Sequence, residues 1–294
     1  MREAICWMNG ELMPAHAAAI PVLDHGLLYG DGVFEGIRFY HGRAFRLAAH
    51  LERLALSARA IALVLPLERA ALEHAVEQTI TAYGHGEGYL RVVVTRGVGP
   101  LGLDPSACTT PNLLIIADAI SLHDPQRSAR GIRVVIAATR RLAADGLDPR
   151  LKSLNYLNNV LARIEASHAG ADEAILLNRE GRVAEGSAEN LFIVRNGELA
   201  TPPVSEGALD GITRRCVIEL ARSAGIGVHE MPLSPYDLYT ADECFLTGTG
   251  AELIAVREID GRPLPMCPGV VFADLLTRFH ACVRDETQPT TQMA

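Results

Sequence analysis

Short apolar runs joined by tight turns constrain the fold of this chain more than any other feature. "AICWMNGEL" places Asn9 and Gly10 between two such runs, and "GVFEGIRFYHGRAFRL" places His41 and Gly42 in the same way. Asn-Gly is a strong hairpin signal because both residues accept a left-handed backbone. Helical patterns are fewer, and they do not alternate regularly with the strand patterns. We therefore expect an α+β fold and not a series of βαβ units.

The composition changes once along the chain, and this change predicts two domains. Residues 121–131, "SLHDPQRSARG", are polar, contain a proline and show no periodicity, as is typical of an interdomain linker. The boundaries that follow are a small N-terminal domain over residues 1–120 and a larger C-terminal domain over residues 132–294.

Three patterns in the second half predict defined elements. "GITRRCVIELARSAG" predicts a helix that begins directly after Gly211, and "DECFLTGTGAELIAVREID" predicts two strands joined by a glycine turn. "LNYLNNVLARIEASHAG" predicts a helix with one apolar face. The residues of that face are Leu154, Leu157, Val160, Leu161 and Ile164.

Composition and charge exclude several classes of protein. The net charge of -8 argues against a nucleic-acid-binding protein, and the chain lacks the long apolar run that a membrane span requires. The N-terminus "MREAICWMNGELMP" does not resemble a signal peptide. The six cysteines have neither C-x-x-C nor zinc-finger spacing, so we expect no metal and free thiols in a reducing cytoplasm.

Of the 27 basic residues, only Lys152 is a lysine. Unlike a guanidinium, a lysine amine can lose its proton and form a Schiff base with a carbonyl. A compositional bias that replaces lysine by arginine would spare a lysine whose chemistry arginine cannot reproduce. The alternative is a lysine that survived by chance on a solvated face, so its neighbourhood has to decide.

Two further signals fit a pyridoxal 5'-phosphate enzyme, which needs a phosphate site and an acid near the ring nitrogen. In "DGIT", Ile212 and Thr213 would offer backbone N–H groups at a helix start, where phosphates bind well. In "AEGSAENLF", Glu185 could hold the ring nitrogen. Taken singly, these could be an ordinary helix start and a turn carboxylate. "GDGVFEG" lacks the G-x-G-x-x-G spacing of dinucleotide folds.

Six motifs in order, "HGLLYGDGVFEGIRFY", "FRLAAHLERL", "LKSLNYLNNVLARIEA", "GRVAEGSAENLF", "LDGITR" and "FLTGTGAEL", closely resemble the fold-type IV pyridoxal-phosphate aminotransferases. The resemblance implies a small N-terminal α/β domain and a larger, β-rich α/β domain that binds the cofactor. It also implies that Lys152 forms the Schiff base and that Glu185 contacts the ring nitrogen. The remaining cofactor contacts that it implies are Arg53, Ile212, Thr213 and Thr249 at the phosphate and Tyr156 near the phenolic oxygen.

On the substrate side, "YGDGVFEGIR" and "YLR" are similar to the branched-chain amino acid aminotransferases. Leu101 and Leu103 stand where the D-amino acid enzymes typically have an arginine and a histidine. The resemblance therefore implies ping-pong transamination of L-leucine, L-isoleucine and L-valine with 2-oxoglutarate or glutamate. The substrate-binding residues that it implies are Tyr29, Phe34, Gly36, Arg38, Tyr89, Arg91, Thr249 and Gly250.

The family also implies a homodimer or larger homo-oligomer, in which a loop near Gly102–Ser106 reaches the pocket of the partner subunit. Three other functions stay open on the same scaffold. One is a D-amino acid or (R)-amine transaminase, and another is an aminodeoxychorismate lyase. The third is a non-enzymatic binding protein, against which the retained Lys152 argues.

Overall fold

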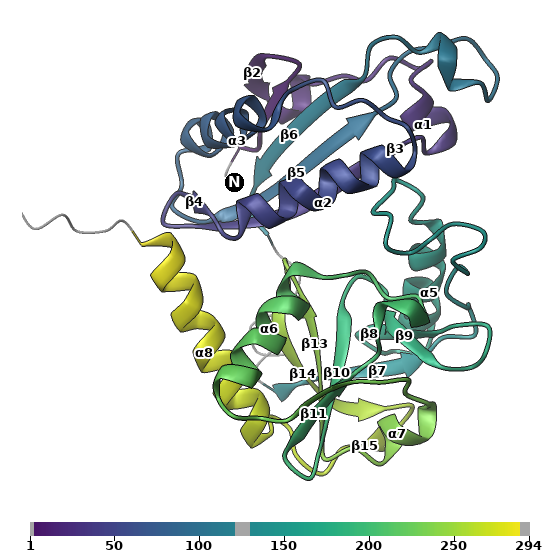
Figure 1. The fold of residues 1–294 in the computed structure, drawn as a ribbon, viewed down its shortest axis with the longest axis vertical. Helices are drawn as coiled ribbons and strands as arrows, with labels where there is room; N and C mark the ends of the chain where they lie inside the picture. The colour runs from purple at the N-terminus through teal and green to yellow at the C-terminus, as the bar shows by residue number, and fades with distance from the viewer. Residues whose placement is uncertain (1–2, 121–129, 289–294) are drawn as a thin grey trace, which may run out of the picture. The chain divides into compact units, whose positions relative to one another are not determined.

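The computed structural model describes residues 3–120 and 130–288, which fall into two compact units (Figure 1). Unit 1 comprises Met1–Ile120, Leu151–Asn155 and Cys282–Ala294, and unit 2 comprises Ser121–Arg150 and Tyr156–Ala281. The units follow contacts and not chain order, so the short segment with Lys152 packs with the N-terminal part of the chain. The predicted domains, 1–120 and 132–294, stay a prediction, and most of the predicted linker lies outside the described residues.

Unit 1 is built on an antiparallel sheet of six strands in the order β2-β1-β6-β5-β3-β4. Both predicted hairpins are confirmed, and Asn9, Gly10, His41 and Gly42 all have the positive φ that such turns require. The strands are β1 (Ile5–Met8), β2 (Glu11–Pro14), β3 (Gly32–Tyr40), β4 (Arg43–Ala44), β5 (Gly88–Thr95) and β6 (Asn112–Asp118).

Two helices, α2 (Leu47–Ala60) and α3 (Arg69–Tyr83), cover one face of this sheet. Alternate residues of β3, including Val33 and Ile37, form the core with them. Because side chains alternate along a strand, the residues between these point to the opposite face. The sheet therefore has one core face and one face that is available for a site. The other helical segments of unit 1 are α1 (His25–Tyr29) and the short turns Ala15–Ala17 and Pro105–Ala107.

Unit 2 holds a mixed sheet of nine strands, in the order β12-β11-β10-β13-β14-β7-β8-β9 with β15 paired to β14. The predicted strand–turn–strand unit corresponds to β13 and β14 and is confirmed. The strands are β7 (Ile132–Ile136), β8 (Glu173–Leu177), β9 (Val183–Gly186), β10 (Asn190–Arg195), β11 (Glu198–Thr201), β12 (Val228–Glu230), β13 (Glu243–Gly248), β14 (Glu252–Ile259) and β15 (Arg262–Pro263).

Among the residues that the structure describes, four helices accompany this sheet, and α6 begins at Ile212 as predicted. They are α5 (Leu157–His168), α6 (Ile212–Ser223), α7 (Pro235–Tyr239) and α8 (Val270–Thr287), the last of which ends within the residues of unit 1; a further short turn is Val204–Glu206. Helix α5 packs on β8 through Ala162 and Ala166, which are fully buried. These small side chains allow the helix to approach the strand closely.

The large apolar residues of α5 lie on its outer side. Leu157, Val160, Leu161 and Ile164 are between 45% and 69% exposed. The predicted apolar face therefore exists from Leu157 onward, but it does not pack on the core of unit 2. Leu154, which was expected at the start of that face, precedes the helix and belongs to unit 1.

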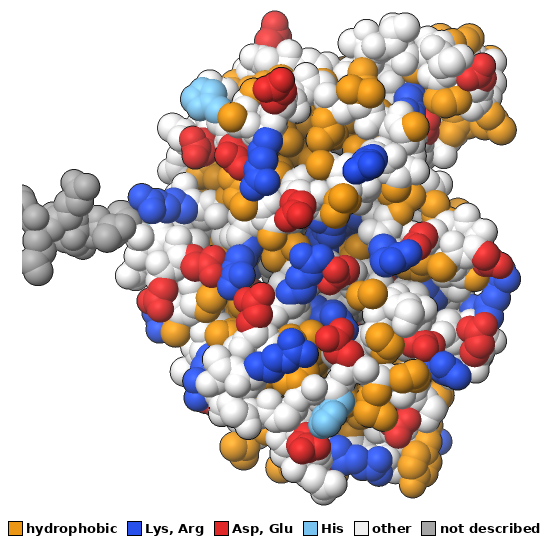
Figure 2. All heavy atoms as spheres, viewed as in Figure 1, with side chains coloured by type: hydrophobic (Ala, Val, Ile, Leu, Met, Phe, Trp, Pro, Cys, Tyr) orange, Lys and Arg blue, Asp and Glu red, His pale blue; other side chains and the backbone are white. Residues whose placement is uncertain are grey.

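The helices, side-chain groups and surface of the described residues add three observations. No helix in residues 3–120 and 130–288 is long and apolar enough to cross a membrane, and no group of acidic, histidine or cysteine side chains there could hold a metal ion. On the face drawn in Figure 2, arginine and acidic side chains are interspersed without a continuous field of one sign.

Candidate active site

Lys152 lies in a short segment that runs along the start of β3. The backbone N–H of Phe34 donates to the carbonyl of Lys152 at 3.0 Å, and the N–H of Leu154 donates to the carbonyl of Gly32 at 2.9 Å. Ser57 on α2 accepts the Lys152 N–H at 3.3 Å. Backbone bonds on both sides thus fix the position of the lysine relative to the sheet of unit 1.

The open face of the sheet collects most of the expected substrate residues. Gly36 lies opposite Arg91, and Arg38 lies opposite Tyr89, in the register of β3 and β5. The Phe34 ring lies 4.5 Å from Lys152 Nζ and 4.6 Å from the Arg91 guanidinium carbon, both measured to the ring centroid. Cations are attracted to an aromatic face at such distances. One apolar ring therefore contacts both the candidate nucleophile and a candidate carboxylate-binding cation.

Gly36 is required on this face by the neighbouring Tyr89 side chain. A Cβ atom at position 36 would lie 1.8 Å from the Tyr89 hydroxyl, which no real contact permits. The Arg91 guanidinium carbon lies 5.5 Å from the Tyr89 ring centroid. Gly36 thus lets the tyrosine lie against the strand, where its hydroxyl and the arginine share one surface.

Tyr29 and Arg38 also contact other residues of unit 1. Tyr29 ends α1, and its hydroxyl accepts the backbone N–H of Gly102 at 3.0 Å. The guanidinium carbon of Arg38 lies 4.9 Å from the Tyr40 ring centroid. Tyr29 therefore anchors the loop that contains Gly102, and its role toward a substrate stays a prediction.

Arg53, the expected phosphate arginine, belongs to a buried polar cluster on the core face. Its Nε and Nη2 atoms donate to the two carboxylate oxygens of Glu35 at 2.7 and 2.8 Å, and His50 Nδ1 lies 2.7 Å from Glu35. Burial alone would raise the pKa of Glu35, but the charge of Arg53 and the His50 hydrogen bond lower it to about 2. Burial lowers the pKa of the His50 imidazole. Glu35 is therefore ionised, and it holds Arg53 by two parallel hydrogen bonds.

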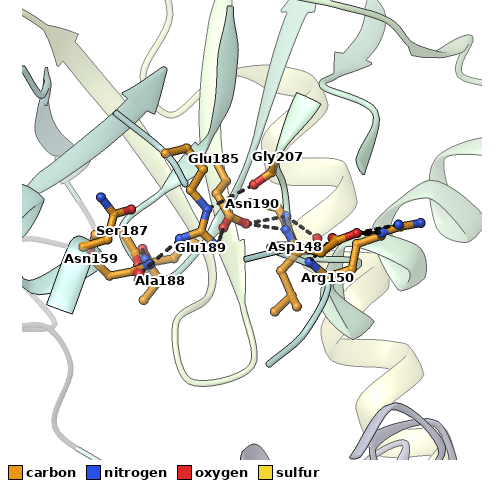
Figure 3. A network of polar contacts seen from close by, with 12 residues as sticks. Asp148, Arg150, Asn159, Glu185, Ser187, Ala188, Glu189, Asn190 and Gly207 are labelled. Carbon is orange, nitrogen blue, oxygen red and sulfur yellow. Dashed lines mark hydrogen bonds and ion pairs between the residues drawn. The ribbon is translucent and has the colours of Figure 1, made fainter. Parts of the chain in front are cut away.

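In unit 2, Glu185 lies near the end of β9 as a buried carboxylate with partners on both oxygens (Figure 3). Arg141 Nη2 lies 2.7 Å from Oε1, and the N–H of Leu209 donates to Oε2 at 2.8 Å. Asn190 donates to the same Oε2 at 3.3 Å. Glu185 is thus not a turn carboxylate facing water, because it is buried and its partners hold it in one orientation.

Asn190 links Glu185 to the expected phosphate site. Its amide donates to the carbonyl of Leu209 at 2.8 Å, and a Cβ atom at Gly211 would lie 2.0 Å from its oxygen. Gly211 caps α6 without a side-chain hydrogen bond, so the first N–H groups of this helix have no side-chain cap. Ile212 and Thr213 follow, both buried.

Strand β13 adds a second polar group, Thr247. It lies opposite Asn190 in the register of β10 and β13. The buried Thr247 hydroxyl has no hydrogen-bond partner among the described residues. Thr249 and Gly250 form the turn just after this strand. An uncapped helix start, an unpaired hydroxyl and a fixed carboxylate in one unit fit a phosphate-bearing ring such as pyridoxal phosphate.

Tyr156 lies at the start of α5, beside a cavity of about 370 Å³ in unit 2. Asn159, Ser187 and Ala188 also line this cavity. Asn159 donates to the carbonyl of Ser187 at 2.5 Å and accepts from Arg141 at 3.1 Å. The cavity wall is therefore connected to the hydrogen bonds that hold Glu185.

The structure thus gathers the expected residues in two sets, each within its own unit. Lys152, Arg53 and the substrate residues belong to unit 1, apart from Thr249 and Gly250, and the other cofactor residues belong to unit 2. Sequence reasoning missed Glu35, His50, Arg141 and Asn190. The spacing of His50 and Arg53, three residues apart on one helix, could have signalled the first pair. Nothing in the sequence distinguishes Arg141 from the other arginines.

Comparisons with known proteins identify the family. The family model described as "Amino-transferase class IV" matches residues 32–259, which include most residues of both sets. The chain belongs to this family.

Similar proteins agree with this assignment. A Methanocaldococcus jannaschii protein named "Putative branched-chain-amino-acid aminotransferase" is 50% identical over 256 residues, covering 87% of this chain and 88% of its own. The Thermoproteus uzoniensis branched-chain aminotransferase, solved with norvaline, has a TM-score of 0.90 at 37% identity, covering 97% of this chain and 96% of its own. The Thermobaculum terrenum branched-chain amino acid aminotransferase, solved in its PLP-form, has a TM-score of 0.87 at 30% identity, covering 97% and 95%.

These findings confirm the family resemblance, the α+β fold of fold-type IV and the enzyme class, a pyridoxal-phosphate-dependent aminotransferase. The individual roles predicted for the site residues stay predictions, and the geometry of each unit now gives them partners and distances.

Proposed function

We propose that this protein transfers the amino group of L-leucine, L-isoleucine or L-valine to 2-oxoglutarate, with pyridoxal 5'-phosphate as cofactor and ping-pong kinetics. The observation that carries this proposal is the open sheet face of unit 1, where the Phe34 ring contacts both Lys152 and Arg91. When bound, the cofactor supplies an aldehyde that forms a Schiff base with an amine and a ring that accepts electrons from the substrate Cα.

The residues of this chain then have distinct tasks. Lys152 Nζ would hold the cofactor in the resting enzyme, and its amine would take the proton from the substrate Cα. Glu185 would hold a proton on the ring nitrogen. Arg53 would bind the phosphate, and the N–H groups at the start of α6 would offer it hydrogen bonds. Tyr156 would contact the phenolic oxygen, and the turn at Thr249 and Gly250 would bind a carboxylate.

The substrate face suits both half-reactions. The apolar Phe34 ring favours a branched aliphatic side chain, whereas Arg91 and Arg38 attract the second carboxylate of glutamate or 2-oxoglutarate. At positions 101 and 103 the chain has leucines and no cation, unlike the D-amino acid pattern.

The experiment is a substrate comparison on purified holoenzyme. L-leucine, L-isoleucine and L-valine with 2-oxoglutarate should give glutamate, and D-alanine, an (R)-amine and aminodeoxychorismate should give much lower rates or none. Glutamate formation must depend on added amino acid and disappear in Lys152→Ala. Faster turnover of D-alanine than of L-leucine, or pyruvate release from aminodeoxychorismate, would replace this proposal by one of its alternatives.

The protein is further proposed to act as a homodimer or larger homo-oligomer in the cytoplasm. Leu101 and Leu103 are 77% and 80% exposed, although the loop between them is anchored through Gly102. Exposed leucines on an anchored loop are typical of a surface that another chain covers. All six cysteines are free thiols, as a reducing compartment maintains them.

Sedimentation of the wild type and of a Leu101→Asp, Leu103→Asp variant tests the oligomer. The wild type should sediment as a dimer or larger species, and the variant should dissociate with a loss of activity. A fully active wild-type monomer would refute the shared site, and cell fractionation tests the compartment.

A further inference from the structure

Arg141 is a buried arginine that follows β7 and has three separate acceptors in unit 2. Its Nη2 lies 2.7 Å from Glu185 Oε1, its Nε donates to the carbonyl of Gly207 at 3.1 Å, and its Nη1 donates to Asn159 Oδ1 at 3.1 Å. The backbone N–H of Arg141 donates to the carbonyl of Leu177 at 2.8 Å, which fixes its main chain. The guanidinium is therefore tied to Glu185, to the Gly207 turn and to α5 at the same time.

The stem of Arg141 packs closely against the Gly207 turn. Gly207 has a φ of +101°, and a Cβ atom there would lie 3.2 Å from Arg141 Cγ. The turn thus lets the arginine stem pass close to its backbone. Lysine could replace the charge but not the planar group that spans three acceptors.

The burial of Glu185 gives this contact its importance. A buried carboxylate without a positive partner is unfavourable in its charged form. Leu209 and Asn190, which also bind the carboxylate of Glu185, are neutral donors. Arg141 therefore brings to this set of contacts the positive charge that compensates the charge of Glu185.

We propose that Arg141 is a positioning residue that keeps Glu185 ionised and oriented, so that a proton shared with the ring nitrogen of the bound cofactor lies on the nitrogen. This inference rests on the proposed function, in which Glu185 contacts that nitrogen. A cation beside the carboxylate favours the ionised carboxylate, and the proton then stays on the ring. The fixed orientation of Glu185 further avoids reorganisation when the cofactor binds.

Three variants separate charge from geometry. Arg141→Met removes the charge, Arg141→Lys keeps the charge without the three-acceptor geometry, and Arg140→Met changes the neighbouring exposed arginine as a control. Each holoenzyme is prepared with pyridoxal phosphate labelled with ¹⁵N in the ring. The ¹⁵N chemical shift reports whether the ring nitrogen carries a proton, and equilibrium dialysis gives the dissociation constant of the cofactor.

The wild type, Arg140→Met and Arg141→Lys should show a protonated ring nitrogen. Arg141→Met should move the ¹⁵N shift toward neutral pyridine and weaken cofactor binding by about tenfold or more, as expected for loss of a charge-assisted contact. Arg141→Lys should weaken binding less than Arg141→Met. A wild-type ¹⁵N shift in Arg141→Met, or a neutral ring in Arg141→Lys, would overturn the inference.

A double variant keeps the test decisive if Arg141→Met does not fold. Arg141→Met combined with Glu185→Gln removes both buried charges, so its melting temperature without cofactor should exceed that of Arg141→Met alone. A double variant that melts no higher than the single one would show that Arg141 acts independently of Glu185. This comparison uses no substrate, whereas a wild-type protein without leucine transamination would refute the proposed function instead.

Discussion

The carboxylate pair formed by Glu189 and Glu173 should make the stability of this protein depend on pH, and Glu189→Gln should remove that dependence. Glu189 is half-buried in the turn after β9, and the N–H of Ala188 donates to it at 3.1 Å. Glu173 is almost fully buried and lies 3.2 Å from Arg163. Burial, and then the charge of Glu173, raise the pKa of Glu189 from an ordinary 4.5 to about 8.

The direction in which the free energy of unfolding changes with pH follows from the number of protons bound in the folded and unfolded states. Between pH 4.5 and about 8, the folded protein keeps a proton on Glu189 that the unfolded chain has lost. The free energy of unfolding should therefore fall by about 1.4 kcal/mol per pH unit in this window and level off above it. The full shift would amount to about 5 kcal/mol, and sharing of the proton with Glu173 reduces it, so we expect about 2 to 5 kcal/mol.

Urea unfolding at pH 5, 6, 7, 8 and 9, with saturating cofactor and fixed protein concentration, measures this effect. Glutamine imitates the protonated acid, so Glu189→Gln should gain stability relative to the wild type as the pH rises toward 8. Glu180→Gln, at an exposed glutamate in the turn before β9, is the control and should follow the wild type. A constant difference between Glu189→Gln and the wild type across this range would refute the reasoning.

Two other predictions concern unit 1. Gly36→Ala should push the Tyr89 side chain off the open sheet face and lower kcat/KM for L-leucine by about tenfold or more; unchanged steady-state kinetics would contradict the role of this contact. Glu35→Gln should lower the free energy of unfolding at pH 7 by about 3 kcal/mol, because Arg53 loses its buried partner. The ionised Glu35 stabilises the fold above pH 4.5, and this contribution is lost as the pH falls through about 2, so the difference from the wild type should shrink in acid urea titrations. Glu52→Gln, on the exposed side of α2 next to Arg53, is the control and should change neither the free energy of unfolding nor its dependence on pH. Equal stability of Glu35→Gln and the wild type at pH 7 would contradict this prediction.

Local patterns predicted the elements whose physical cause is local. The Asn9–Gly10 hairpin and the start of α6 after Gly211 depend on backbone preferences that a few residues express. Periodicity also identified the apolar face of α5, but it could not tell which side of the helix meets the sheet. Ala162 and Ala166 occupy the core side because small side chains allow close packing on β8.

The partners of the site residues were beyond the sequence because they come from distant parts of the chain. The register of β3 alternates Phe34 toward the open face with Glu35 toward the core, and this alternation brings Glu35 to Arg53 on α2. Arg141 meets Glu185 only after β7, β8 and β9 have paired. The motifs thus point to the candidate chemical groups, whereas the strand pairing decides what holds them.

In the proposed function, Lys152 and the open sheet face make this chain an aminotransferase for branched-chain L-amino acids. The most direct measurement is the visible spectrum of the purified holoenzyme before and after L-leucine is added without an oxo acid. We expect a yellow protein whose band is replaced by that of the pyridoxamine form, with no such band in Lys152→Ala. A yellow band that persists with L-leucine but disappears with D-alanine would contradict the substrate assignment, and a fully active Lys152→Ala protein would contradict the mechanism.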